Sequence, residues 1–322
     1  MQKFFSQERI VFLLWLLMFC GFAIALPNFL SYGNLIALIR SVSVLGILAI
    51  GMAVVVIGRG IDLSLIATMA ISTAFAFMLA DGGIPLWFAL AIGLTFAVCV
   101  GAASGWLIAY VEIPPLFATL AMGAFVYGFG RFALFSQDVI AMPKNAAAIG
   151  WIGGGEIWGV PVPILLFVLT AALLAMVLRR TRPGQFIHAT GDNPSAARIT
   201  GLPVRPLTVL QYAISAVIGY GAGLIVATGV TSMNTRIVNS TLIYDVILVV
   251  VLGGISLSGG KGGVRNVIVG TLLIGTLLNG MTILDVQYTL QNVIKSFILL
   301  LAIIIDSIVN PRDEQTAQQG DI

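Results

Sequence analysis

Apolar stretches of membrane-spanning length recur along this chain, and one long polar segment, residues 179–205, separates them. A helix needs about 20 predominantly apolar residues to cross a bilayer. The stretches lack the two-residue alternation of barrel strands. Only 9% of the residues are charged, against about 25% in soluble domains. The sequence therefore predicts an all-α polytopic membrane protein with about ten transmembrane helices, in a single transmembrane domain over residues 1–322.

We expect the spans at approximately 10–30, 42–58, 64–80, 86–109, 115–135, 161–179, 207–229, 243–257, 264–282 and 289–309. The first follows the polar start MQKFFSQERI and is long for a signal peptide, so we expect it to remain as an uncleaved helix. The 36 glycines suit close helix packing in lipid.

Basic residues indicate which ends of the spans face the cytoplasm, because cytoplasmic loops carry an excess of Lys and Arg. With the N-terminus inside, 11 of the 16 basic residues fall at cytoplasmic ends: Lys3, Arg9, Arg59, Arg179, Arg180, Arg182, Arg198, Arg205, Lys261, Arg265 and Arg312. Both termini are then cytoplasmic, with a polar tail over about 310–322. The outer loops are 81–83, 136–160 and 230–242. We expect 136–160 to lie at the interface as short helices, and its tryptophans either form the interfacial belt or contact an external partner.

The chain offers little evidence for enzymatic or metal chemistry. Cys20 and Cys99 both fall inside apolar runs, so we interpret them as inert packing residues and not as a disulfide. His188 has no nearby Cys or Glu cluster, which argues against a metal site. We find no Ser/His/Asp or Cys/His set for hydrolysis, and we expect no cofactor. An intramembrane enzyme is therefore a minor alternative.

Two apolar runs end at glycines on the inner side. The first reads VVVIGRGIDLS to Ser64, and the second reads VVVLGGISLSGGKGG to Gly263. With a one-residue gap the strings nearly match, which is weak evidence for an internal repeat. Non-helical backbone at membrane depth survives only inside protein or beside a water-filled cavity, so these breaks indicate a transport path. Asp62 either caps the helix that follows it or contacts substrate directly.

The Gly-Gly-Lys-Gly-Gly run does not bind nucleotide as a P-loop would. That motif needs G-x-x-x-x-G-K-[ST]. Here Ile255 occupies the first glycine position, and Gly262 follows the lysine where a hydroxyl is required. If transport uses ATP, another chain must hydrolyse it.

The polar segment reads as a turn, a short helix and a stop. Asp192 or Asn193 can serve as the N-cap, Pro194 suits the first helical position, and Gly201 ends the helix. A helix of about six residues is not stable alone in water. It must pack against its own protein or in a groove of a partner.

Several motifs in order resemble the permease subunits of ribose-type sugar ABC importers, over about residues 34–310. They are G-I-D-L-S at Gly60–Ser64, F-x-T-L at Phe117–Leu120, G-x-x-x-x-A-x-G-x-N-P-x-A-A-R-x-x-G at Gly184–Gly201, and L-G-G-x-S-L-x-G-G-K-G at Leu252–Gly262. The resemblance implies the type II importer permease fold, a bacterial inner membrane, a homodimer, separate ATPase subunits on the cytoplasmic side and a periplasmic sugar-binding protein.

The resemblance also implies that the short helix from Pro194 to Thr200, in the loop at about 180–206, is the coupling helix that docks in a groove of the ATPase. The residues carried over to that role are Gly191, Asp192, Asn193, Pro194, Ala196, Ala197, Arg198 and Gly201.

The chain departs from the family pattern at positions that bear on sugar specificity. Arg59 replaces a glycine before the first motif, and Leu65-Ile66 replaces Val-Gly. The usual E-L-D-A-I-A becomes the bulkier L-I-Y-D-V-I at Leu242–Ile247, which keeps the aspartate, Asp245, and loses the glutamate. Ribose, another pentose, a hexose, a polyol or a furanose signalling molecule all remain open.

A neutral sugar requires hydroxyl and amide partners along its path. The candidates are Asp62, Ser64, Ser72, Thr73, Ser104, Thr119, Asn239, Asn279, Ser256 and Ser258. Other polar residues, among them Glu112, Arg131, Asp245 and Asp306, are expected at helix ends or in ion pairs, such as one between Lys295 and Asp285. The alternative function is an ion-coupled secondary transporter of a small polar solute.

Overall fold

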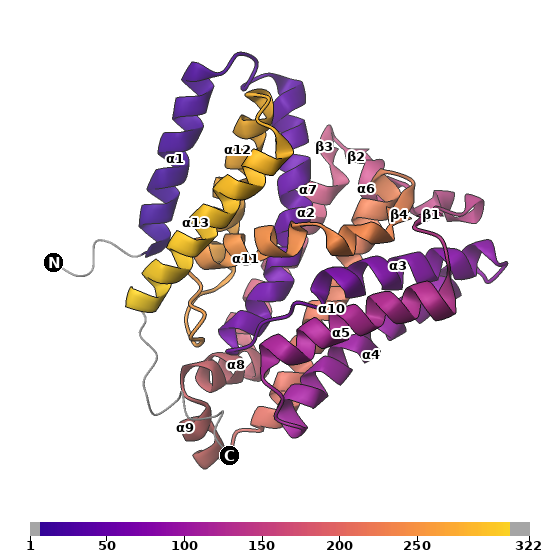
Figure 1. Ribbon diagram of the computed structural model, residues 1–322, viewed down its shortest axis with the longest axis vertical. Helices are drawn as coiled ribbons and strands as arrows, with labels where there is room; N and C mark the ends of the chain where they lie inside the picture. The colour runs from indigo at the N-terminus through magenta and orange to yellow at the C-terminus, as the bar shows by residue number, and fades with distance from the viewer. Residues whose placement is uncertain (1–6, 310–322) are drawn as a thin grey trace.

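A computed structural model describes residues 7–309 and places a helix at each of the ten expected positions. In chain order these are α1 (Gln7–Ala25), α2 (Tyr32–Ile57), α3 (Leu65–Asp81), α4 (Leu86–Tyr110), α5 (Pro115–Phe129), α7 (Val162–Arg180), α10 (Val204–Gly229), α11 (Leu242–Leu252), α12 (Val264–Ile283) and α13 (Tyr288–Val309). In Figure 1, α1 and α12 stand near upright at the upper left, and α3, α4 and α5 run at a steep angle to them at the lower right. The polar tail, Lys3 and Arg312 lie outside the described residues.

Two of the ten helices are shorter than a span. Among the described residues, eight helices are long and apolar enough to cross a membrane, with α5 continuing through the π-helical turn η1 (Gly130–Leu134). The exceptions are α3, with 17 residues, and α11, with 11. Both adjoin a glycine break, because α3 begins just after the first break and α11 ends at the second.

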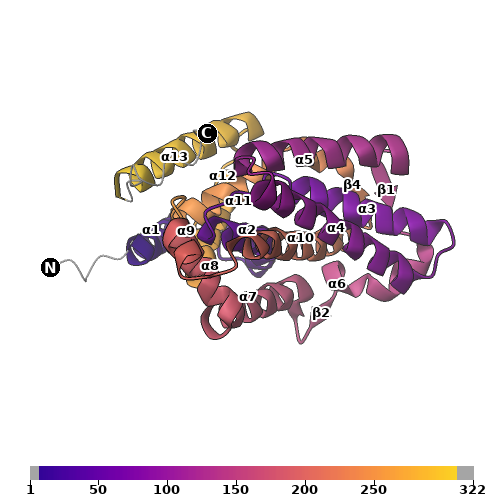
Figure 2. The ribbon, with the colours of Figure 1, turned by 90° about the horizontal axis from the view of Figure 1, so that it is seen from below.

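The helix α2 lies at the centre of the bundle. Leu48, Ile50 and Met52 in its second half are fully buried. Figure 2 shows α2 and α10 between two outer layers, with α5 and α13 on one side and α7 on the other. Glycines on α4 allow α10 to approach closely, because a Cβ at Gly105 would meet the Cα of Val209 at 2.6 Å. This is the packing by small residues that is common between helices in lipid.

The loops that are predicted to lie outside contain strands as well as the expected short helices. The short helices are η2 (Lys144–Ile149), α6 (Trp151–Gly154) and η3 (Thr235–Asn239). Two small antiparallel ladders accompany them: β2 (Glu156–Ile157) with β3 (Val160–Pro161), and β1 (Val139–Ala141) with β4 (Ser232–Asn234). The second ladder joins two loops that are far apart in sequence, and this pairing left no pattern in the local sequence.

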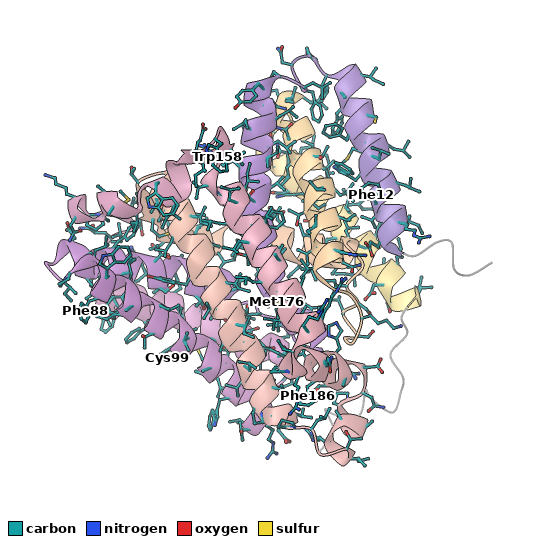
Figure 3. All side chains as sticks on the ribbon, turned by 180° about the vertical axis from the view of Figure 1, so that it is seen from behind. Phe12, Phe88, Cys99, Trp158, Met176 and Phe186 are labelled. Carbon is teal, nitrogen blue, oxygen red and sulfur yellow. The ribbon has the colours of Figure 1, made fainter. Side chains whose placement is uncertain are left out.

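Two expectations about surface residues can be compared with the structure. Both cysteines are free and exposed, so the interpretation of Cys20 and Cys99 as packing residues is wrong. Figure 3 shows Cys99 on the outside of the bundle. Apolar helices expose apolar residues to lipid as readily as they bury them, so hydropathy alone cannot tell the two faces apart. Trp158 is 99% exposed in the outer loop, which fits either role expected for the tryptophans.

Candidate coupling site and transport path

The polar segment between α7 and α10 folds into two helices, α8 (Arg182–Asp192) and α9 (Pro194–Ile199). The turn expected before the short helix is instead α8. Thr181 caps it by accepting a hydrogen bond from the N–H of Gly184 at 3.3 Å. One face of α8 is buried, with Ile187 fully covered. Spacing of the buried positions by three or four residues, as in Gly184, Ile187 and Gly191, was the signal available in the sequence.

The predicted end signals of α9 are confirmed. Asn193 is the N-cap, and its side-chain oxygen accepts a hydrogen bond from the N–H of Ala196 at 2.9 Å. Pro194 begins the helix, and Gly201 ends it with a left-handed φ of 81°. Each feature follows from the known preferences of helix ends.

The helix α9 rests on the protein with one residue and presents the rest outward. Ala197 is 4% exposed, whereas Ile199 is 87% exposed. Ser195, Ala196 and Arg198 are also exposed. The exposed part of α9 therefore carries one large apolar and one basic side chain, Ile199 and Arg198.

The end of α8 contacts the backbone of both glycine breaks. A Cβ at Gly191 would clash with the carbonyl oxygen of Ile57 and would lie 2.6 Å from the N of Gly260. The N–H of Gly260 donates to that same Ile57 carbonyl at 2.8 Å. Gly260 has a left-handed φ of 73°, and a Cβ there would meet the Cα of Asp192 at 2.6 Å. We call Ile57, Gly191 and Gly260 the backbone junction, because only glycine allows so close an approach.

The two breaks begin with the same backbone turn. After α2, hydrogen bonds run from the N–H groups of Gly58, Arg59 and Gly60 to the carbonyls of Val54, Val56 and Val55. After α11, the equivalent bonds run from Gly253, Gly254 and Ile255 to Val249, Val251 and Val250. The middle residue is left-handed in both, with φ of 70° at Arg59 and 91° at Gly254. This shared geometry supports the internal repeat that the sequence only suggested.

The side chains after each turn repeat as well. The Oδ1 atom of Asp62 accepts hydrogen bonds from the N–H and the hydroxyl of Ser64 at 3.1 and 2.6 Å. In the second break, Ser256 Oγ lies 3.2 Å from the N of Ser258, which donates to it, and 2.7 Å from the Ser258 hydroxyl. Asp62 is 2% exposed and orders the turn before α3. The N-cap residue of α3 is Ser64, which makes no side-chain cap hydrogen bond, so Asp62 is not the N-cap that the capping interpretation proposed.

Two outer helices hold the breaks in equivalent ways. The N–H of Leu63 donates to the hydroxyl of Thr119 on α5 at 3.1 Å. The N–H of Leu257 donates to the carboxylate of Asp306 on α13, also at 3.1 Å. Thus α5 relates to the first break as α13 relates to the second.

The central helix α10 holds the first break from its other side. The hydroxyl of Ser215 donates to Asp62 Oδ2 at 2.8 Å, and the hydroxyl of Tyr212 donates to the carbonyl of Ile61 at 3.2 Å. Buried polar groups of the break are therefore satisfied by protein.

A cavity of about 640 Å³ lies between the first break, α9 and the ends of α4, α5 and α10. Its walls include Gly60 from the break, Pro194 and Arg198 from α9, and Gln211 from α10. The cavity therefore reaches from α9 to the first break.

The structure gathers the predicted cytoplasmic arginines at the end of the bundle that carries α8. Arg59, Arg198 and Arg205 line the 640 Å³ cavity. Arg179 and Arg265 line a smaller one beside His188. This clustering is consistent with the predicted parity of the spans, while the membrane side itself stays a prediction.

The candidate path residues fall into three groups. Asp62, Ser64, Ser256 and Ser258 form the two breaks, and Thr119 binds the first of them. Ser72, Thr73 and Ser104 are fully buried. Asn279 exchanges two hydrogen bonds with Asn34, at 3.0 and 2.8 Å, while Asn239 is exposed at the end of η3. Among the described residues, none of the ten lines the 640 Å³ cavity, and their role in transport stays a prediction.

The remaining polar residues form pairs, but one partner differs from expectation. Lys295 Nζ lies 2.8 Å from Asp245 Oδ1, so the suggested pairing with Asp285 is wrong. The two residues are 50 positions apart, and only the packing of α11 against α13 brings them together. Arg205 pairs with Glu112 at 3.1 Å, and Arg131 with Asp138 at 2.7 Å.

Comparison with known proteins identifies the family. Residues 34–304 match the family described as "branched-chain amino acid transport system / permease component". The ribose import permease protein of Escherichia coli strain K12 is 31% identical over 282 residues, covering 87% of this chain and 88% of that protein. The galactofuranose transporter permease protein of the same strain is 32% identical over 276 residues, covering 86% and 80%. Its L-arabinose transport system permease protein is 31% identical over 294 residues, covering 90% and 87%. The chain therefore belongs to this family of permease components and is a multi-pass membrane subunit of an ABC transporter, a transport subunit and not an enzyme.

Proposed function

We propose that this chain is the permease of an ATP-driven importer for a monosaccharide, ribose or a related sugar, in a bacterial inner membrane with both termini cytoplasmic. Three relatives named for ribose, galactofuranose and L-arabinose support the sugar class. We further propose that a second copy completes the permease and that a periplasmic binding protein delivers the sugar. Membership in a family of ABC permeases argues against the ion-coupled alternative.

The observation that carries the proposal is the backbone junction. A partner that pulls on α9 also moves α8, since only Asn193 separates the two helices. At Gly191, α8 contacts both Ile57 and Gly260. One displacement therefore reaches the ends of both broken segments at once. We propose that Gly191, Asp192, Asn193, Pro194, Ala196, Ala197, Arg198 and Gly201 couple an ATPase to the breaks in this way.

The 640 Å³ cavity fits the inner end of the path. One wall is the first break and another is α9, so movement of α9 changes the size of the cavity. A site that opens and closes with ATPase motion, and that binds its cargo weakly, suits an importer whose affinity resides in an external receptor.

The test is to replace Arg198 by Glu and measure both assembly and transport. We expect the variant to lose at least tenfold in ATPase affinity, because the charge on the exposed face of α9 is reversed. Sugar uptake driven by ATP in proteoliposomes should fall by the same factor. Ile199→Asp tests the apolar part of the same surface and should behave alike.

The matched control is Lys144→Glu, an exposed basic residue at the start of η2, which should leave ATPase binding unchanged. Normal assembly and uptake in Arg198→Glu and Ile199→Asp would exclude α9 as the docking element. Uphill uptake by the purified permease alone, on a sodium or proton gradient, would reject the importer itself.

A further inference from the structure

Resting on the proposed function, we propose that α11 and α13 carry a sugar-contact patch in the transport path, made by Thr241, Tyr244, Asp245, Tyr288, Asn292, Lys295 and Ser296. We call these seven residues the polar patch. The path candidates chosen from the sequence do not include any of them.

Three residues of the patch form a polar stripe along α13, whose residues are mostly apolar. Tyr288, Asn292 and Ser296 recur every four residues and therefore lie on one face of α13. Tyr288 is 61% exposed and Ser296 is exposed. The apolar side chains Val293 and Phe297, also exposed, point to a different face of the same helix. Amphipathic α13 thus has one side suited to lipid and another suited to water.

A buried ion pair lies directly beneath the stripe. Lys295 is 6% exposed and Asp245 is 8% exposed, and the Nζ atom of Lys295 lies 2.8 Å from Asp245 Oδ1 and 3.0 Å from Oδ2. Lys295 is seven residues into α13, about 10 Å along the helix axis. Ionisable residues at such depth are costly, and they mark transport pathways when they face a bundle interior or a water-filled cavity.

Hydrogen bonds connect the ion pair to the stripe. Lys295 Nζ donates to the hydroxyl of Thr241 at 3.4 Å. That hydroxyl lies 3.2 Å from the hydroxyl of Tyr288 and donates to the Oδ1 atom of Asn292 at 3.3 Å. The result is a continuous polar network that runs from the buried pair to the exposed surface of α13.

The chemistry of the patch fits a neutral polyhydroxyl ligand. The ammonium and the carboxylate cancel, so the patch has no net charge to attract an ion. Amide, hydroxyl and carboxylate groups can exchange hydrogen bonds with sugar hydroxyls. Tyr244, which is 57% exposed, and Tyr288 add the aromatic surface typical of ligand sites. The cavity beneath the stripe has a volume of only about 20 Å³, which is too small to enclose a sugar. The sugar therefore contacts the surface of the patch and passes along it.

Thiol labelling tests whether the patch faces water. In a variant with Cys20→Ala and Cys99→Ala, single cysteines are placed as Asn292→Cys and Ser296→Cys, and the permease is reconstituted with its ATPase and binding protein. We expect a membrane-impermeant maleimide to label both at least tenfold faster than the matched control Val293→Cys, which is exposed at the same depth on the apolar side. Equal rates at all three positions would overturn the proposal.

Sugar protection tests the ligand class. Uptake of ribose, L-arabinose and galactose is first measured in the same vesicles, and the sugar that is taken up then serves as protector. We expect it to slow labelling at Ser296→Cys at least threefold and to leave Val293→Cys unaffected. Labelling without protection would show a hydrated surface that sugar does not contact. A disulfide between two copies of Ser296→Cys, with labelling abolished, would assign the patch to a contact between permeases. Either result overturns the polar patch while ATP-driven uptake still stands, whereas the absence of uptake for all three sugars counts against the proposed function.

Discussion

The two glycine breaks begin alike and continue differently. Both open with the same left-handed turn and the same pair of side-chain hydrogen bonds. After Ser64 the helix α3 begins at once, whereas five residues, Gly259–Gly263, separate Ser258 from α12. The extra residues of the second break reach α8, through Gly260 at the junction and through the Gly262 carbonyl, which lies 3.3 Å from His188 Nε2.

From this difference we expect the two glycine breaks, as copies of one internal repeat, to have separate mechanical roles. The first break is fixed by a buried carboxylate and by hydroxyl groups of α5 and α10. The second has Ser256 at the position of Asp62, is held by the buried carboxylate of Asp306 on α13, and extends a glycine loop to the polar segment. We therefore expect the first break to act as an anchor, while the second adds a glycine loop to the contact that Ile57 already makes with α8. Three substitutions test this comparison.

The largest effect is expected at the junction. Gly191→Val places a branched side chain against the backbone of both breaks, and overpacking of this kind costs about 1–3 kcal/mol in unfolding free energy. Because α8 must shift, ATP-driven uptake should fall at least tenfold even where the protein folds. The control is Gly221→Ala on α10, where a Cβ meets nothing within 4 Å. Uptake at the normal rate by Gly191→Val would separate the junction from coupling.

The anchor should depend on its carboxylate more than the second break depends on its serine. Asp62→Ala leaves the N–H and hydroxyl of Ser64 and the hydroxyl of Ser215 without their acceptor, at a cost of about 3 kcal/mol. Ser256→Ala should cost about 1 kcal/mol. Urea unfolding of the purified permease measures both. Equal losses would show that the two copies are equally anchored.

The smallest effect concerns the residue in the left-handed position of each turn. Arg59 holds a φ of 70°, which costs a non-glycine residue about 1 kcal/mol. Arg59→Gly should therefore raise the unfolding free energy by about that amount, and Gly254→Ala should lower it by about 1 kcal/mol. Thermal unfolding of the two variants gives the values. Loss of stability in Arg59→Gly would mean that contacts of the arginine side chain outweigh the strain.

Sequence reasoning located elements whose signals are local. Hydropathy placed all ten helices, and cap residues such as Asn193 and Gly201 placed the ends of α9. The motifs also located both breaks. These features depend on nearest neighbours along the chain, so one sequence is enough to find them.

Contacts between distant segments could not be predicted in the same way. The partner of Lys295 is set by the packing of α11 on α13, and sequence reasoning chose the wrong carboxylate. The meeting of Gly191 with Gly260 depends on three segments folding together. A glycine-rich sequence indicates that backbone approaches closely, but it does not indicate which backbone.

The ladder between β1 and β4 has a consequence for how an external receptor can act. The ladder pairs Ile140 with Met233, and the carboxylate of Asp138 forms ion pairs with both Arg131 and Arg236. The strand β1 follows α5, and β4 precedes α11. Under the proposed function, a receptor that docks on either loop would displace the adjoining ends of both helices together, including Thr241 just before α11. Delivery of cargo at the rim and rearrangement of the side chains around Lys295 would then occur as one event.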